Sequence, residues 1–366
     1  MAKRVIISGG GTGGHVFPAI AIGRALKARN EEIEILFVGA KGKLEMQKVP
    51  KAGFDIIGLW ISGFHRHLTI RNLLFPFKLL WSMIHSFFIL RRFRPDVVIG
   101  VGGYASGAIM KMAGWLGIPY MIQEQNSYAG VTNKLVASDA EAVCVAYDKM
   151  EEYFPKEKIR FTGNPVRKDI LNLGRGLKEA RSYFDLDPEK KTILVVGGSL
   201  GARSINDAIS HGLKTIQLDP DIQILWQCGS LYHDEFKDRT SAQVKVRAFL
   251  DRMDLAYIAA DLIISRAGAS TVSELCMIGK AAIMVPSPNV AEDHQTKNAN
   301  SIADHDGALV IRDSEAKAIL LMTALDLLKD EKRCHELGQS IKALGKPNAT
   351  AAIVEVAMEI MNRTSK

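Results

Sequence analysis

The chain has 366 residues, of which 47% are hydrophobic and 24% charged, so a largely disordered protein is excluded. The length predicts two domains. Four cysteines stand far apart, which supports neither a zinc motif nor a disulfide framework and indicates a reducing compartment. The net charge of +7 arises in the first half: residues 1–163 carry 21 Lys/Arg against 13 Asp/Glu, and residues 164–366 carry 26 against 27. This one-sided basic charge predicts an anionic partner, which is a nucleic acid, a membrane surface or a phosphorylated substrate.

We expect neither a secretory signal nor a membrane-spanning helix. The first residues lead directly into a strand-like run at 5–8. The longest strongly apolar run without charge covers residues 79–90, and a span needs about 20 residues.

Short β-rich runs alternate with helix-period segments along the chain. The expected strands are 4–8, 33–38, 96–100, 119–123 and 141–145, followed by 191–197, 222–227, 243–247, 261–264 and 281–285. The expected helices include 16–29, 106–116, 203–217, 270–279, 293–304 and 348–364. Such alternation is typical of parallel sheets with helices on both faces, so the sequence predicts two doubly wound α/β domains that divide near residue 163.

The first strand runs into a glycine-rich turn at residues 9–15. A strand, a glycine turn and a helix N-terminus place free backbone N–H groups at one point, which favours a phosphate or diphosphate. A dinucleotide site would need an acidic residue at the end of the second strand, and residues 37–41 contain none. A purely structural tight turn remains the alternative.

Two further glycine turns follow strands, at residues 100–107 and 198–201. The first suits a second anion contact or, equally well, the close packing of a helix on a sheet. The second opens the first helix of the second domain, where Ser199 adds a hydroxyl, and it favours a phosphate site.

A polar segment at residues 265–274 follows the strand at 261–264. We expect Glu274 in the first turn of a helix, where its carboxylate would accept both hydroxyls of a ribose. The alternative is structural: Ser270 or Thr271 caps the helix and Glu274 closes a capping box.

Several of these segments resemble the MurG family of glycosyltransferases. The matching segments are residues 10–19, 102–107, 124–126, 162–167, 197–202, 267–274 and 294–299, and the resemblance spans about residues 4–360. It implies the GT-B fold, with two Rossmann-like domains that face a central cleft. It further implies an acceptor and membrane-docking domain at 1–163, a UDP-GlcNAc-binding domain at 164–345, and a C-terminal helix at 346–366 that packs back on the first domain.

The resemblance also implies an activity and a location. Members are inverting transferases that move GlcNAc from UDP-GlcNAc to the 4-hydroxyl of the muramyl sugar of undecaprenyl-diphosphate-linked lipid I. The product is lipid II, the precursor of peptidoglycan. The resemblance implies that the transfer takes place at the cytoplasmic face of the bacterial inner membrane and needs no metal or cofactor. It also implies other cell-wall synthesis proteins as possible partners.

By the same resemblance, a set of residues binds the donor. Asn126 and Gln295 hold the sugar, Arg167 and Ser199 the diphosphate, and Glu274 the ribose. The remaining donor contacts are Thr12, Gly13, Gly14, Leu250, Gly268, Ala269, Ser270, Thr271, Val272 and Ser273. The acceptor diphosphate is assigned to Gly102, Gly103, Tyr104 and Ser106.

Three interpretations of the catalytic base remain open. His15 begins the helix after the first glycine turn, where the helix dipole favours a neutral imidazole. Glu124, which ends the strand at 119–123 beside Asn126, is the rival base. In the third interpretation His15 donates to a phosphate or to the leaving group and takes no proton.

The segment 56–95 contains no acidic residue, although it contains six Lys/Arg and a dense apolar run. Such a segment favours docking on an anionic membrane surface. We assign this role to Phe75, Phe77, Trp81, Arg66, Arg71, Arg91 and Arg92. The alternative is an ordinary pair of buried helices; nucleic acid is disfavoured because no recognised binding module is present.

Three other functions would fit the same architecture. They are a UDP-GlcNAc 2-epimerase, a dinucleotide-dependent oxidoreductase and a non-catalytic nucleotide-sugar-binding module.

Overall fold

A computed structural model describes residues 2–62, 74–171, 174, 176–198 and 200–363. The chain forms two compact units. The first comprises Met1–Val166 and Asn348–Lys366, and the second comprises Arg167–Pro347. Each unit is described on its own below.

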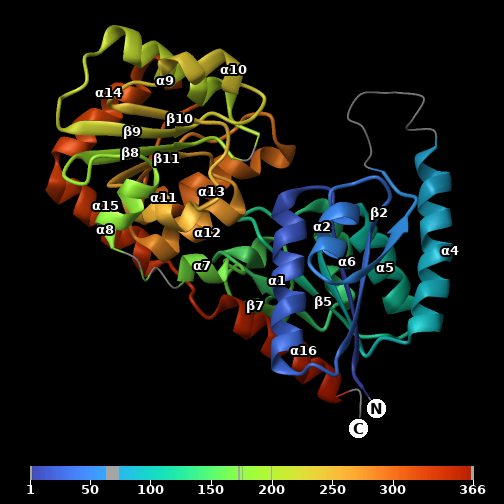
Figure 1. The fold of residues 1–366 in the computed structure, drawn as a ribbon. Helices are drawn as coiled ribbons and strands as arrows, with labels where there is room; N and C mark the ends of the chain where they lie inside the picture. The colour runs from blue at the N-terminus through green and yellow to red at the C-terminus, as the bar shows by residue number, and fades with distance from the viewer. Residues whose placement is uncertain (1, 63–73, 172–173, 175, 199, 364–366) are drawn as a thin grey trace. The chain divides into compact units, whose positions relative to one another are not determined.

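The first unit is built on a seven-stranded parallel sheet with strand order β3-β2-β1-β4-β5-β6-β7 (Figure 1). The strands are β1 (Arg4–Gly9), β2 (Glu34–Ala40), β3 (Asp55–Leu59), β4 (Val97–Gly102), β5 (Tyr120–Glu124), β6 (Ala142–Val145) and β7 (Ile159–Phe161). Its helices are α1 (Gly13–Arg29), α2 (Glu45–Lys51), α4 (Phe75–Phe93), α5 (Tyr104–Trp115), α6 (Val131–Val136) and α16 (Ala349–Arg363), with single 3₁₀ turns at Ala137–Asp139, Met150–Glu152 and Lys156–Lys158.

Both faces of this sheet are buried, which explains why its strands read as continuous apolar runs. Alternate residues point to opposite faces. Val5 and Ile7 of β1 pack in one cluster with side chains of α1 and α16, whereas Ile6 packs in another with side chains of α5. The sheet is therefore the middle layer of three.

The C-terminal helix belongs to the first unit. Figure 1 shows α16, in red, beside the blue α1, and the two helices are in contact. Ile353, Ala357 and Met361 of α16 are fully buried. The first unit also includes residues 164–166, because buried Asn164 donates to the Gln125 carbonyl at 2.8 Å and accepts from Gln123 at 2.9 Å. The units thus meet a few residues after the expected boundary at 163.

The second unit repeats the plan with a six-stranded parallel sheet of order β10-β9-β8-β11-β12-β13. The strands are β8 (Lys191–Val196), β9 (Ile222–Gln227), β10 (Val244–Arg247), β11 (Leu262–Ser265), β12 (Ala281–Met284) and β13 (Leu309–Val310). The helices are α7 (Lys168–Leu171), α8 (Leu177–Tyr183), α9 (Arg203–Thr215), α10 (His233–Phe236), α11 (Met253–Ala259), α12 (Ala269–Ile278), α13 (His294–Ala303), α14 (Ala316–Lys329) and α15 (Glu331–Ala343), with 3₁₀ turns at Lys237–Arg239 and Ala291–Asp293.

Each sheet has one point where the strand order reverses. In the first unit β1 lies beside β4, and in the second β8 lies beside β11. The loops after two such strands leave in opposite directions, so a crevice opens at the carboxyl ends of the strands. All the glycine turns singled out in the sequence lie at these two points.

The basic apolar segment is described only in part. Its described residues form one helix of 19 residues, α4, at Phe75–Phe93, and residues 63–73 lie outside the description. Its buried residues include Ser82 and Ser86, while several of its large apolar side chains face solvent. One side of α4 packs against α5, and the opposite side presents large apolar side chains that are exposed in the part of the chain that the structure describes.

Candidate functional site

The first glycine turn joins β1 to α1. Gly11 has a φ of +86°, a left-handed conformation that glycine adopts without strain. Helix α1 begins at Gly13 with no acidic residue in its first turn, and the hydroxyl of the capping residue Thr12 lies 3.5 Å from His15 Nδ1 and makes no capping bond to a backbone N–H. The N-terminal N–H groups of α1 thus lack a side-chain cap, which favours an anion there.

His15 lies in the first turn of α1 and is partly exposed. Its Nδ1 lies 3.0 Å from the carbonyl oxygen of Gly10. A carbonyl oxygen only accepts hydrogen bonds, so Nδ1 carries a proton, and in the neutral form of the ring the lone pair is on Nε2. The free Nε2 lone pair is what a general base requires.

The second glycine turn, between β4 and α5, interlocks with the first. Gly10 N–H donates to the Gly102 carbonyl at 3.2 Å. A methyl group added at Gly103 would lie 2.6 Å from the Gly10 oxygen, and one at Gly102 would lie 2.8 Å from the His15 ring. Glycine at these positions is therefore a packing requirement as well as a conformational one, since φ is positive at both.

The residues that follow the second turn differ in their access to a ligand. Tyr104 is about half exposed. Ser106 is fully buried, and its hydroxyl faces Met110 Sδ in the core at 4.0 Å. The assignment of Ser106 to the acceptor diphosphate stays a prediction, and with the hydroxyl buried it would rest on the backbone of Ser106.

Glu124 is buried, and both of its carboxylate oxygens are occupied. Oε1 accepts from the backbone and side-chain nitrogens of Asn126 at 3.1 and 3.3 Å, and Oε2 accepts from Gly130 N at 2.9 Å and Asn133 Nδ2 at 2.8 Å. With these four hydrogen bonds, the Glu124 carboxylate orders the loop after β5, which carries Asn126. This geometry argues against Glu124 as the base, because no lone pair faces an exposed position.

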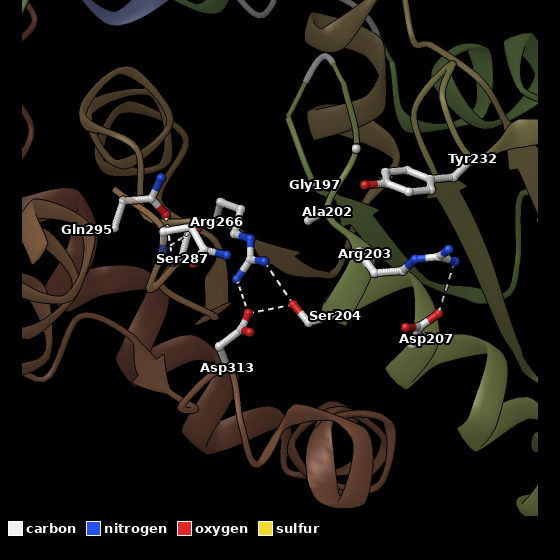
Figure 2. A pocket seen from close by; sticks show the side chains of 12 residues that line it. Gly197, Ala202, Arg203, Ser204, Asp207, Tyr232, Arg266, Ser287, Gln295 and Asp313 are labelled. Atoms are coloured by element: carbon white, nitrogen blue, oxygen red, sulfur yellow. Dashed lines mark hydrogen bonds and ion pairs between the residues drawn. The ribbon is translucent and has the colours of Figure 1, made fainter. Parts of the chain in front are cut away.

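The second unit contains a pocket of about 470 Å³ at its own reversal point. It is lined by Gly197, Gly201, Ala202, Arg203, Ser204, Asp207, Tyr232, Arg266, Ser287, Asn289, Gln295 and Asp313. Figure 2 shows these side chains around the start of α9. The lining is polar, with two guanidinium groups and two carboxylates, and both arginines form ion pairs with acidic neighbours.

Arg266 ties the pocket wall together. Its guanidinium donates to Ser204 Oγ at 2.8 Å, to Asp313 and to the carbonyl oxygens of Val285 and Pro286 at 2.9 and 3.2 Å (Figure 2). The segments after β8, β11, β12 and β13 are thereby joined by one side chain. This role of Arg266 could not be predicted from the sequence, where Arg266 is only one residue of the polar segment 265–274.

Gln295 lies in the first turn of α13 and points into the pocket (Figure 2). Its Oε1 accepts from the Ser287 N–H at 2.9 Å, which orients the side-chain amide. Gln295 is the one expected donor-binding residue that lines this pocket in the described part of the chain; Ser199, at the adjacent turn, lies outside the described residues.

Glu274 belongs to a second cluster, on α12. Tyr257 Oη donates to Glu274 Oε2 at 2.9 Å. Burial raises the pKa of the Glu274 carboxyl above its ordinary value, an effect that the Tyr257 hydroxyl and the charge of Arg167 oppose. The guanidinium of Arg167 is also held by Asp169, with contacts of 3.1 and 2.5 Å, and this pairing raises the pKa of Arg167.

The capping interpretation of Glu274 is wrong. The capping residue of α12 is Gly268, without a side-chain hydrogen bond, and Glu274 lies in the second turn instead of the first. The uncapped first turn leaves Ser270 and Thr271 partly exposed. Gly268 to Ser273 can therefore offer backbone groups, while the Val272 side chain is part of the core. Leu250 is also buried, and its N–H donates to Gln227 Oε1 at 3.3 Å.

A third surface lies on α4, in the first unit. Phe77, Leu80, Trp81 and Phe88 are 56–68% exposed, and Arg91 and Arg92 are exposed at the end of the same helix. Phe75 is partly exposed, and Arg66 and Arg71 lie outside the described residues. No helix in the described ranges combines the length and apolar character that crossing a membrane requires.

The described residues contain no group of three or more His, Cys, Asp or Glu placed to hold a metal ion. The first unit contributes backbone N–H groups, the His15 imidazole and the Asn126 amide, and the second contributes guanidinium groups, the Gln295 amide and the Glu274 carboxyl group.

The comparisons with known proteins cover nearly the whole chain. The glycosyltransferase family 28 N-terminal domain matches residues 5–145, and the family 28 C-terminal domain matches residues 192–353. A UDP-N-acetylglucosamine–N-acetylmuramyl-(pentapeptide) pyrophosphoryl-undecaprenol N-acetylglucosamine transferase from Flavobacterium psychrophilum is 52% identical over 98% of both chains. A transferase of the same name from Bacteroides fragilis is 48% identical over 99% of this chain and 97% of its own.

The comparison with solved structures points to the same family. The crystal structure of MurG from Acinetobacter baumannii has a TM-score of 0.79 and 30% identity over 98% of this chain and 99% of its own. CalG4, the calicheamicin glycosyltransferase, has a TM-score of 0.72 at 13% identity, and a UDP-N-acetylglucosamine 2-epimerase has 0.64 at 14%, so these two are similar in fold alone. The expected GT-B fold, with two parallel α/β domains, is confirmed, and the chain belongs to the MurG family of glycosyltransferase family 28.

Proposed function

We infer that the chain transfers N-acetylglucosamine from UDP-N-acetylglucosamine to the muramyl sugar of lipid I, giving lipid II for peptidoglycan. The observation that carries this conclusion is the 48–52% identity, over nearly the full length, to transferases that bear this name. The two sites at the reversal points supply what the reaction needs: N–H and guanidinium donors for a diphosphate, a carboxylate for a ribose and an imidazole with a free lone pair.

In our proposal the second unit binds the donor. The diphosphate lies at the turn 197–201 and the start of α9, where the pocket walls carry Arg203 and Arg266. Gln295 holds the sugar and Glu274 the ribose hydroxyls, with Arg167 close to that carboxylate. Backbone groups of Leu250 and of residues 268–273 surround the uracil.

The first unit supplies the acceptor side. The interlocked turns at 10–14 and 102–104 offer N–H groups to the diphosphate of lipid I and approach the donor through Thr12, Gly13 and Gly14. Asn126, positioned by Glu124, contacts the transferred sugar.

The chemical step exchanges two bonds at one carbon. The acceptor 4-hydroxyl oxygen forms a bond to the anomeric carbon, while the bond from that carbon to the UDP oxygen breaks and its electron pair leaves with the diphosphate. The hydroxyl proton passes to His15 Nε2, the unprotonated nitrogen. The N–H groups and guanidinium groups around the diphosphate stabilise the charge that develops on the leaving group.

We also propose that the exposed apolar face of α4 docks on the anionic inner membrane from the cytoplasmic side. Its aromatic side chains would enter the headgroup region and its arginines would meet anionic lipids. Docking there would bring the enzyme to a substrate that is itself anchored in the membrane. Other cell-wall synthesis proteins remain possible partners.

The function is tested by incubating the purified chain with labelled UDP-GlcNAc and a lipid I analogue. We expect a lipid-linked disaccharide and free UDP in equal amounts, with no conversion when the lipid is omitted. Conversion of UDP-GlcNAc to its C2 epimer without acceptor would contradict the proposal and identify an epimerase.

Replacement of His15 by alanine removes the proposed base. We expect kcat to fall by about 10²–10⁴-fold, while the donor KM stays near the wild-type value. Glu124→Gln keeps the size of the rival side chain and serves as the comparison: it should lower kcat less than His15→Ala does. A near-normal kcat for His15→Ala would exclude His15 as the base.

Glu274→Gln separates binding from stability. The raised pKa means that the Glu274 carboxyl group binds its proton more tightly in the folded chain than in the unfolded chain. The free energy of unfolding therefore falls as the pH rises from the ordinary pKa of a glutamate through the raised pKa of Glu274. Glutamine still accepts from Tyr257, so thermal stability at neutral pH should be unchanged or slightly higher. The donor KM should rise about tenfold, because a charge-assisted bond to the ribose is lost. The exposed Glu189 provides the control, since Glu189→Gln should alter neither quantity. A loss of stability with normal donor KM would show that Glu274 is structural.

The α4 surface is tested on vesicles that contain phosphatidylglycerol. The triple variant Phe77→Ser, Leu80→Ser and Trp81→Ser should bind at least tenfold more weakly, because each side chain loses burial worth about 1.5–3 kcal/mol. Arg91→Gln with Arg92→Gln should weaken binding mainly at low salt. A matched triple variant of exposed residues in the second unit, Leu177→Ser, Leu231→Ser and Met322→Ser, should bind normally. Equal loss in both triple variants would place the docking surface elsewhere.

A further inference from the structure

A fully buried carboxylate lies beneath the first glycine turn. Glu45, the first residue of α2, has no solvent exposure. Its Oε2 accepts from the Gly11 N–H at 2.9 Å, and its Oε1 accepts from the Ala40 N–H at 2.9 Å. One side chain from α2 thus joins the turn after β1 to the end of β2.

The surrounding glycines leave room for this carboxylate. A methyl group added at Gly10 would lie 2.1 Å from Glu45 Oε1, and one added at Gly39 would lie 2.5 Å from Glu45 Cγ. No side chain fits at either position while Glu45 occupies its place. The glycines are therefore part of a built site for the carboxylate.

The bond to Gly11 reaches His15 through a single peptide group. The carbonyl of Gly10 and the N–H of Gly11 belong to the same planar trans unit, so they point in opposite directions and rotate together. The N–H meets Glu45 Oε2, and the carbonyl oxygen meets His15 Nδ1 at 3.0 Å. A carboxylate that fixes this N–H also fixes where the carbonyl points.

We propose that Glu45 is a positioning residue for His15, acting through the Gly10–Gly11 peptide to keep the imidazole proton on Nδ1 and the lone pair on Nε2. This inference rests on the proposed function, in which His15 Nε2 receives the acceptor proton. A buried carboxylate makes a strong charge-assisted bond to the peptide N–H, and hydrogen bonds in a chain polarise one another. The Gly10 oxygen is thereby a better acceptor for the Nδ1 proton. The arrangement resembles a carboxylate–histidine pair with one peptide group inserted between the partners.

The site requires two acceptors, which makes a conservative variant informative. Glutamine has the shape of glutamate but replaces one acceptor oxygen by an NH₂ donor. In Glu45→Gln this NH₂ group would face the N–H of either Gly11 or Ala40. Either the Gly11 N–H or the Ala40 N–H would then lose its hydrogen-bond acceptor.

The test is the tautomer of His15, read from the ¹⁵N chemical shifts of the ring nitrogens in protein labelled at histidine, at a pH where the ring is neutral. His15→Gln identifies the resonances by their absence. We expect wild-type His15 to carry its proton on Nδ1, and Glu45→Gln to shift a large fraction to the Nε2–H form. Glu34→Gln, which changes an exposed carboxylate of β2, should leave the tautomer unchanged. A wild-type protein with the proton on Nε2, or a folded Glu45→Gln with an unchanged tautomer, would overturn the proposal.

A second variant displaces the carboxylate without altering it. In Gly39→Ala the added methyl group collides with Glu45 Cγ from the β2 side, and residues 9–15 keep their sequence. It should produce the same shift in tautomer, so the proposal can still be tested if Glu45→Gln does not fold. Circular dichroism and thermal melting establish that each variant is folded before the spectra are compared.

Kinetics separate this inference from the proposed function. Glu45→Gln should lower kcat by about 10–100-fold, the range found when the partner that orients a histidine is removed, with little change in donor KM. If His15→Ala is fully active, the catalytic role of His15 is wrong even when the tautomer responds to Glu45. If the tautomer does not respond while His15→Ala is inactive, the positioning role of Glu45 is wrong and the base assignment stands.

Discussion

The contact between two glycine turns constrains the first unit at the point where its sheet reverses. Gly10 and Gly103 approach so closely that a methyl group added at Gly103 would lie 2.6 Å from the Gly10 carbonyl oxygen. The Gly10 N–H then bonds to the Gly102 carbonyl, and the His15 ring lies against Gly102. An imidazole and two helix N-termini are gathered within a few residues of backbone, because side chains are absent where the chain segments cross. Ordering glycine-rich turns lowers the conformational entropy of the chain. The hydrogen bonds of Ser8, Gly10 and Gly11 oppose this loss.

In the second unit, the loops at the reversal point of the sheet are held together by a side chain. This reversal point also carries a glycine turn, but the pocket wall is braced by Arg266, whose guanidinium reaches Ser204, Asp313 and two backbone carbonyls. A planar group with five donors can join several loops at once, which a lysine could not do. Arg266 is paired with Asp313 and largely saturated, so it shapes the pocket. Arg203 is paired as well, with Glu235 and Asp207, and the start of α9 has no acidic residue in its first turn.

The sequence predicted the two doubly wound domains well, because both sheets are parallel and their strands are apolar on both faces. It missed β3, β7 and β13; the latter two have only three and two residues, too few to show a pattern. It also placed His15, Gln295 and the glycine turns at the sites. It could not assign Glu45 or Arg266, because their partners lie up to 62 residues away and only the folded chain brings them together. For Glu124 the sequence showed only a carboxylate at a strand end, which suggested a base, whereas the fold shows that local donors from residues 126–133 contact both of its oxygens.

The surroundings of three carboxylates explain how similar groups take different tasks in one protein. Glu124 and Glu45 are buried, and each accepts hydrogen bonds from N–H groups through both of its oxygens. These two side chains therefore order the neighbouring chain segments. Glu274 has one hydroxyl partner and a raised pKa, which means that its charge is less well stabilised by the fold. A carboxylate in that state gains from a ligand that brings two hydroxyl donors, whereas a saturated carboxylate would gain nothing. The degree of saturation, read from the hydrogen bonds, therefore distinguishes Glu274, the proposed ribose ligand, from Glu45 and Glu124, whose oxygens are occupied by N–H donors of the chain.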